Sequence, residues 1–161
     1  MNHTFLSFTI CSEVYAVNVV KVLEVLEKQQ ITRVPNAPHY IKGILNFRGD
    51  VVPVFESRAK FNLPERDAND SFVIIVLDFS HESETFRLGA IVDRVRDVIT
   101  IDETEIKPVP PMSKEFNTEF LQGIFKLKDQ FVMLLNVEKV FTGNELDQLK
   151  ASIDTSETIA N

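Results

Sequence analysis

The side chains that commonly carry acid–base chemistry or bind metals are few and widely spaced in this sequence. The histidines are His3, His39 and His81, and none has a carboxylate or a nucleophile at the spacing of a catalytic pair. The segment with His81, Glu82 and Glu84 could offer metal ligands, but it lacks the two histidines one helical turn apart that characterise a helical zinc site. We therefore expect no metal site and no acid–base catalysis.

Covalent and phosphate chemistry have equally little support. The single cysteine, Cys11, has no partner for a disulfide or a zinc site, so we expect it to be a small buried apolar residue on a strand. The five glycines are scattered singly, so no glycine-rich phosphate loop is present, and tryptophan is absent. We expect a binding protein without a cofactor rather than an enzyme. The alternative class is a small metal-dependent hydrolase, which would show metal dependence or a perturbed acid in a cleft.

The strongest hydrophobic run of the chain, GILNFRGDVVPVF (43–55), is interrupted by Arg48, Gly49 and Asp50. Two strand-like runs joined by these residues predict a hairpin in which Gly49 supplies a positive φ. Pro53 cannot donate a ladder hydrogen bond, which predicts that the second strand lies at a sheet edge or a bulge. Arg48 then pairs with a partner's carboxylate or backbone carbonyls, or it is a solvated turn cation. The pattern by itself leaves both interpretations open.

Composition and charge exclude several classes of protein. The chain has 161 residues, 44% of them hydrophobic and 25% charged, which suffices for a core in one domain or two small subdomains. Its net charge of −7 and unconcentrated Lys and Arg residues argue against nucleic-acid binding. The N-terminus lacks an export signal, and the longest apolar run, FVIIVL (72–77), is far shorter than the ~20 residues of a membrane span. We expect a soluble, cytoplasmic protein.

Most of the chain is predicted to form short strands. Alternation of apolar and polar residues indicates a strand at 4–10 that pairs with a strand at 14–17. Apolar residues three and four apart after a capping Asn18 predict a short amphipathic helix over 19–27. Residues 142–161 form a polar tail that is predicted to be helical near 145–150 and frayed beyond. Further strands are expected at 72–79, 86–92, 97–101, 123–127 and 130–135.

The two halves of the chain resemble each other. The segment 40–61 aligns with 120–141, both having an aromatic start, Gly-Ile, a charged turn, an apolar strand and a terminal Phe. Upstream, residues 15–25 align with 88–98. The sequence therefore predicts a mainly β domain over 1–161 with repeat halves 5–61 and 72–141, each half a small β-barrel module. The alternative is one continuous sandwich whose similarity is accidental.

The same segments resemble a known family. YIKGILNFRGDVVPVFESRAKF (40–61) is similar to the central signature of the CheW family of bacterial chemotaxis coupling proteins, and the flanking segments extend the likeness to about 5–141. The resemblance implies two packed SH3-like five-stranded β-barrels with short helices, between which strands can be exchanged, and a polar tail. It also implies a non-catalytic adaptor of chemotaxis signal transduction.

The resemblance further implies the partners and the binding positions. In this family one barrel docks on the regulatory domain of the histidine kinase CheA, and the cytoplasmic signalling tip of a chemoreceptor lies near the groove between the barrels. The implied location is therefore the cytoplasm, at membrane-associated receptor arrays and without direct membrane insertion. The positions carried over as groove or interface residues are Val22, Glu24, Val25, Arg48, Gly49, Val73 and Val98.

Each implied position also has a purely structural interpretation. The four valines could instead be buried in their own barrels. Glu24 and Arg48 could pair with each other as a structural ion pair. If they do contact a partner, the valines suit the apolar face of a receptor helix, and the two charges suit its polar rim.

One departure from the family pattern is clear. The family favours Asp-Leu-Arg after the V-P-V motif, whereas this chain has Glu56, Ser57 and Arg58. Ser57 removes an apolar side chain, which is expected to loosen packing or alter an edge contact. The departure leaves open a CheW-like scaffold of a specialised pathway such as pilus motility.

Overall fold

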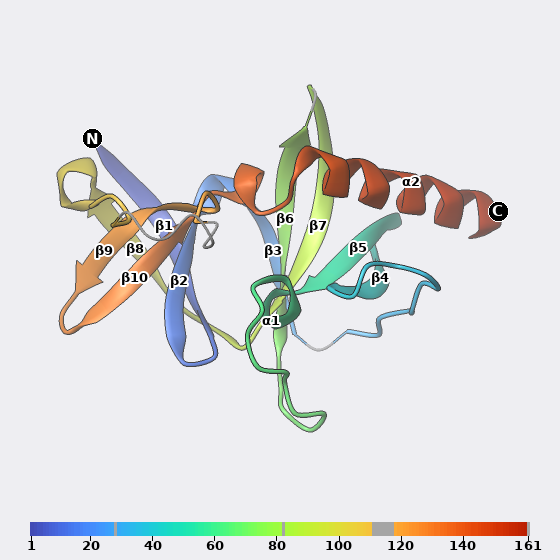
Figure 1. The fold of residues 1–161 in the computed structure, drawn as a ribbon, viewed down its shortest axis with the longest axis horizontal. Coiled ribbons are helices and arrows are strands. Elements are labelled where there is room, and N and C mark those ends of the chain that lie inside the picture. The colour runs from blue at the N-terminus through green and yellow to red at the C-terminus, as the bar shows by residue number, and fades with distance from the viewer. Residues whose placement is uncertain (28, 82, 111–117, 161) are drawn as a thin grey trace.

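The computed structural model describes residues 1–27, 29–81, 83–110 and 118–160, and the strands of these ranges form two five-stranded sheets (Figure 1). The first sheet has the order β8 (Arg94–Asp102), β1 (Asn2–Ile10), β2 (Glu13–Asn18), β10 (Gln130–Leu135) and β9 (Leu121–Leu127). The second has the order β3 (Val22–Leu26), β6 (Val73–His81), β7 (Glu84–Val92), β5 (Asp50–Glu56) and β4 (Ile41–Phe47). The mainly β fold expected from the sequence is confirmed.

Each sheet combines strands from both halves of the chain. The first sheet joins the β1–β2 hairpin to β8, β9 and β10, and the second joins the β6–β7 hairpin to β3, β4 and β5. Both sheets are mixed, because β10 runs parallel to β2 and β5 runs parallel to β7 while the other pairs are antiparallel. The two sheets therefore have the same plan, in which a hairpin from one half is completed by three strands from the other.

The predicted helix over 19–27 is wrong. Only Val19–Lys21 forms a 3₁₀ turn (η1), capped by the Asn18 side chain, which accepts a 3.0 Å hydrogen bond from the Val20 amide. The chain then enters β3, where a bulge lets Val22 and Val25 face the same side, opposite Leu77 and Ile75. This spacing of three imitates a helical stripe. Pairing with the edge of β6 satisfies the backbone and suits β-branched residues, so it prevails over the local pattern.

The hairpin between β4 and β5 is confirmed, with a correction at Pro53. Gly49 has the predicted positive φ, 89°, and Arg48 shares the left-handed region at 53°. However, β5 lies between β7 and β4 and is not an edge strand. Its pairing with β7 covers only Val54 to Glu56, so Pro53 lies in a part of β5 that pairs on one side. Proline is tolerated there because no second ladder runs past it.

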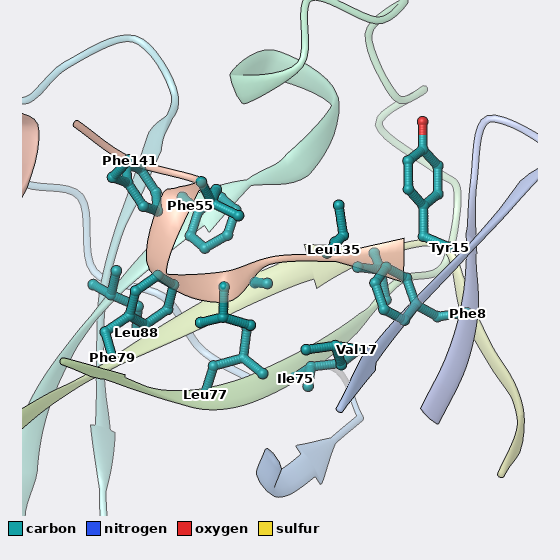
Figure 2. Packing of buried hydrophobic residues seen from close by; sticks show 14 of the residues in the cluster. Phe8, Tyr15, Val17, Phe55, Ile75, Leu77, Phe79, Leu88, Leu135 and Phe141 are labelled. Carbon is teal, nitrogen blue, oxygen red and sulfur yellow. The ribbon is translucent and has the colours of Figure 1, made fainter. Parts of the chain in front are cut away.

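The largest hydrophobic cluster lies between the sheets (Figure 2). Phe8 and Val17 of the first sheet pack there with Ile75 and Leu77 of the second, and Phe141 contacts Phe55 with ring centroids 4.9 Å apart. Each sheet also encloses a smaller cluster of its own, around Phe5 in the first and around Val52 and Val54 in the second.

Three short helices, α1 (Ser57–Lys60), η2 (Glu103–Glu105) and η3 (Val137–Lys139), and one longer helix, α2 (Gly143–Ala160), complete the described part of the chain together with η1. Helix α2 extends past Lys150, so it is longer than the predicted 145–150; Asn161 lies outside the described residues. Its first turn is closed by reciprocal hydrogen bonds between Thr142 and Glu145. Leu146 and Leu149 are buried in the inter-sheet cluster, so this part of the tail belongs to the folded body.

The start of α2 also has a polar anchor. Lys60 Nζ lies 3.2 Å from the Glu145 carboxylate and 5.0 Å from the centre of the Tyr40 ring. Burial and the neighbouring Glu145 carboxylate raise the pKa of Tyr40 to about 12. Tyr40 therefore remains a neutral hydrogen-bonding group under ordinary conditions.

Candidate partner-binding surface

Arg48 lies at the tip of the β4–β5 hairpin, where its own side chain is organised by two contacts. Its guanidinium is 4.7 Å from the centre of the Phe47 ring, and its Nη2 donates a 2.5 Å hydrogen bond to Glu24 Oε2. The Arg48 side chain is 63% exposed and that of Glu24 is 38% exposed. The structural ion pair considered from the sequence is therefore present, and Arg48 still offers most of its surface to solvent.

The Arg48–Glu24 pair connects the two edges of the second sheet. Glu24 is on β3 and Arg48 follows β4, and these strands stand at opposite ends of the strand order. Beyond β3, the backbone groups of Thr32 and Ile44 exchange two 2.8 Å hydrogen bonds, which again join this segment to β4. The sheet must therefore curve until its edges meet. Because the ion pair is largely exposed, we assign it only about 0–1 kcal/mol of stability.

The four predicted valines divide into two groups. Val22 and Val73 are half-buried and pack against the inter-sheet cluster, which agrees with the structural interpretation. Val25 and Val98 are exposed, at 39% and 65%. Val25 stands opposite Ile75 and Val98 opposite Leu6, and both of these neighbours belong to the inter-sheet cluster. Val25 and Val98 thus lie on the inner faces of the two sheets, each on an edge strand.

Val20 is a further exposed apolar residue that was not among the positions predicted from the sequence. In the structure it is 75% exposed on η1, the turn that contacts both β1 and β6. We call Val20, Val25 and Val98 the inter-sheet surface. Glu24 points to the other face of β3 from Val25, so the charged pair and Val25 lie on opposite faces of the same edge strand.

A network of charged side chains, which no local sequence motif predicted, joins α1 and the segment after it to the turn between β7 and β8. Arg58 donates to Asp93 through two nitrogens, at 2.8 and 3.2 Å, and Arg66 Nη1 lies 2.7 Å from the same carboxylate. Arg66 also donates to both oxygens of Glu56, at 3.1 and 3.2 Å. Burial opposes ionisation of Asp93, but hydrogen bonds from Arg58, the Cys11 amide and Arg66 outweigh it and lower the pKa of Asp93. The network secures the segment after α1 to both sheets.

The residues that depart from the family pattern, 56–58, lie beside this network and the inter-sheet cluster. Glu56 and Arg58 both belong to this network. Ser57 is buried at 2% exposure, and it lines a cavity of about 20 Å³ in the inter-sheet cluster, together with apolar residues such as Phe8 and Phe61. A small void beside the shorter side chain is what the loss of an apolar group predicts.

The described residues contain no cluster of three or more possible metal ligands, and Glu82 of the considered His81 segment lies outside them. Within the same ranges, no helix combines the length and hydrophobicity of a membrane span.

Comparison with known proteins decides the family. The family model described as "CheW-like domain" matches residues 4–145. The chain belongs to the CheW family. It is 34% identical over 142 residues to the chemotaxis protein CheW of Klebsiella aerogenes, a match that covers 88% of this chain and 83% of that one. It is also 34% identical over 137 residues to CheW of Helicobacter pylori, covering 84% and 79% of the two chains.

A solved structure agrees with both the fold and the family. The crystal structure of the scaffolding protein TtCheW from Thermoanaerobacter tengcongensis superposes with a TM-score of 0.78 at 31% identity, covering 90% of this chain and 97% of that one. These findings confirm the resemblance inferred from the sequence. They make the chain a scaffolding protein of chemotaxis in the CheW family, which is a non-catalytic family.

Proposed function

We propose that this CheW-family protein acts in the cytoplasm, where it joins the signalling tip of a chemoreceptor to the regulatory domain of the histidine kinase CheA. The observation that carries the receptor part is the inter-sheet surface, in which Val25 and Val98 are exposed on edge strands of the two sheets and Val20 is exposed on η1. An exposed apolar surface rimmed by polar residues is typical of a protein interaction site, which supports a binding role for these valines.

The chemistry of the surface suits an amphipathic helical partner. Val98 and Val25 offer apolar contact to one face of a helix, and the guanidinium of Arg48 offers a planar fork for a carboxylate at its rim. Glu24 holds Arg48 in place through the 2.5 Å hydrogen bond, so the cation is presented in one orientation. A preorganised cation loses less conformational entropy on binding than a free one.

The test is a titration of the purified protein with a receptor signalling-tip fragment and, separately, with the isolated CheA regulatory domain. Val98→Lys is expected to weaken receptor binding about tenfold or more, because it places a charge in the apolar contact. Leu127→Lys, at the tip of the β9–β10 hairpin and 41% exposed, is the matched control and should leave receptor affinity unchanged. Equal receptor affinities for Val98→Lys and the native protein would refute the inter-sheet surface as the receptor site.

Arg48 needs a substitution that its backbone tolerates. Arg48→Asn removes the charge but accepts the φ of 53°, and Lys128→Asn makes the same change at the φ of 57° in the corresponding turn. We expect loss of receptor binding only for Arg48→Asn. If the native protein binds neither the receptor fragment nor the CheA domain, the coupling role in this pathway is wrong and another partner of the same fold must be sought.

A further inference from the structure

A polar cleft separate from the inter-sheet surface lies where the start of β8 meets the β1–β2 turn and the loop before β6. Its volume is about 570 Å³, within the range of small-ligand sites. The lining includes four arginines, Arg58, Arg66, Arg94 and Arg96. Small-ligand sites are mostly apolar, so a cleft with this lining favours a strongly polar occupant.

The charge of the cleft is the reverse of the charge of the chain. Its four guanidinium groups face two carboxylates, Asp70 and Asp93, within a protein of net charge −7. The larger neighbouring cleft, of about 790 Å³, has four cationic side chains, Arg33 and Lys42 among them, and four carboxylates. The smaller cleft therefore concentrates positive potential, and the larger one does not.

The two inner arginines of the cleft are already paired, and the two outer ones are not. Asp93 accepts hydrogen bonds from Arg58, Arg66 and the Cys11 amide. The shortest distance from each donor to the Asp93 carboxylate is 2.8, 2.7 and 2.8 Å, respectively. Among the described residues, Arg94 has no ion-pair partner, and Arg96 donates only to the neutral amide oxygen of Gln130, at 3.2 Å. Arg58 and Arg66 are balanced by Asp93 and Glu56, so the two guanidinium groups on β8 are the cations of the cleft that lack an ionic partner among the described residues.

We propose that this cleft binds the phosphate groups of a small inorganic or organic phosphate, with Arg94 and Arg96 as its charged ligands. The guanidinium fork matches pairs of phosphate oxygens, and the hydroxyls of Thr9, Ser12 and Ser71 line the same cleft as further donors. A diphosphate can engage both free arginines at once, so it binds more tightly than a single phosphate. None of these residues belongs to the inter-sheet surface, so the site is independent of the proposed coupling function.

The site is tested by titrating the full chain with pyrophosphate and with inorganic phosphate at constant ionic strength, while backbone amide resonances are followed by NMR. Saturable shifts are expected at Ser12, Ser71 and Arg94, with the higher affinity for pyrophosphate. The double variant Arg94→Ala, Arg96→Ala should lose affinity about a hundredfold, roughly tenfold for each charged hydrogen-bonding group removed. Arg33→Ala, in the neighbouring cleft, is the control and should bind pyrophosphate like the native chain.

Substitution of Asp70, the other carboxylate that lines the cleft, should raise the affinity for pyrophosphate instead of lowering it. Asp70 repels a bound phosphate, so Asp70→Asn should raise pyrophosphate affinity severalfold while circular dichroism shows an unchanged fold. The proposal is overturned by shifts that do not saturate, by an unchanged affinity in the Arg94, Arg96 double variant, or by an equal loss in Arg33→Ala.

Discussion

Arg48 and Lys128, at the two hairpin tips, have the same backbone conformation but different surroundings. Arg48 and Lys128 have nearly the same φ, 53° and 57°, and each follows the last residue of a corresponding strand. At the first tip Phe47 is buried and Arg48 pairs with Glu24 of the edge strand β3. At the second tip Leu127 and Phe131 are exposed, and the link from the edge strand β8 is a hydrogen bond from the Arg96 guanidinium to the neutral side-chain amide of Gln130.

A feature that only one of the two tips has is not required by the fold. Both sheets close with the same bridge, in which a segment beyond β3 or β8 pairs with Ile44 or with Ile124. Neither an ion pair nor an arginine is common to the two tips, so the arginine at 48 is not a condition of this hairpin. The chemistry at Arg48 is therefore free to serve binding, which is the basis of the proposed function.

The bridge that closes each sheet passes close to a glycine, and substitution of that glycine is expected to destabilise the protein most. A Cβ on Gly43 would lie 2.2 Å from the Thr32 carbonyl oxygen, a clash with backbone. On Gly123 it would first meet the end of the Ile106 side chain at 2.6 Å, and then the Lys107 carbonyl oxygen at 2.9 Å. Gly43→Ala should lower the free energy of unfolding by about 3 kcal/mol or more, and Gly123→Ala by about 1–3 kcal/mol. Urea unfolding of both variants measures the difference, and equal losses would contradict this ranking.

The two halves of the chain also differ at Asp93, which has no charged counterpart in the first half. Asp93 lies between β7 and β8, where the sequence alignment of the halves places Val20 on η1. Asp93→Asn leaves Arg58 and Arg66 with weaker partners in a site where their side chains are only 15% and 9% exposed. We expect a loss of about 2–3 kcal/mol at neutral pH, measured by urea unfolding.

The pH dependence of that loss has a defined sign. Because the pKa of Asp93 is lowered in the folded protein, its stabilisation is fully present above the ordinary value of 3.8 and disappears as the pH falls through the folded value. The stabilities of the native protein and of Asp93→Asn should therefore converge below pH 3.8. A gap that stays constant into that range would show that the loss is one of packing and not of charge.

Much of this architecture could be predicted from local sequence, and the failures share one cause. The hairpins were visible because alternation and turn residues are local signals, as at Gly49. The strand at Val22 to Leu26 was mistaken for a helix because a bulge, set by pairing with β6, changed its period. The Glu56, Arg58, Arg66 and Asp93 network joins residues 35 positions apart at Arg58 and Asp93, and nothing local specifies such a pairing. Likewise, only the strand order reveals that Val25 and Val98 are both on edge strands.

The second residue of each tip also differs in backbone conformation. Gly49 has φ 89°, whereas Asp129 is not among the residues with positive φ. A Cβ on Gly49 would meet nothing within 4 Å, so the conformation and not the space requires glycine. Gly49→Ala should cost about 1 kcal/mol of stability, and Asp129→Ala less than about 0.5 kcal/mol. Thermal unfolding of the two variants checks this, and a larger loss for Asp129→Ala would overturn the assignment of the two turns.

At the first tip, substitution of Glu24 should change the stability of the fold least while it still weakens receptor binding. Glu24→Gln removes the charge that holds Arg48 but keeps a hydrogen-bond acceptor in place, and the pair is largely exposed. Its effect on the free energy of unfolding should be below about 1 kcal/mol and should shrink further at high salt. Receptor binding should nevertheless fall, because Arg48 is no longer held in one orientation. Arg96→Gln, which alters the hydrogen bond to Gln130 at the second tip, is the matched control and should change receptor binding little. If Glu24→Gln destabilises the protein by several kcal/mol and leaves receptor affinity intact, the ion pair serves only to close the second sheet, and Arg48 loses its place in the proposed interface.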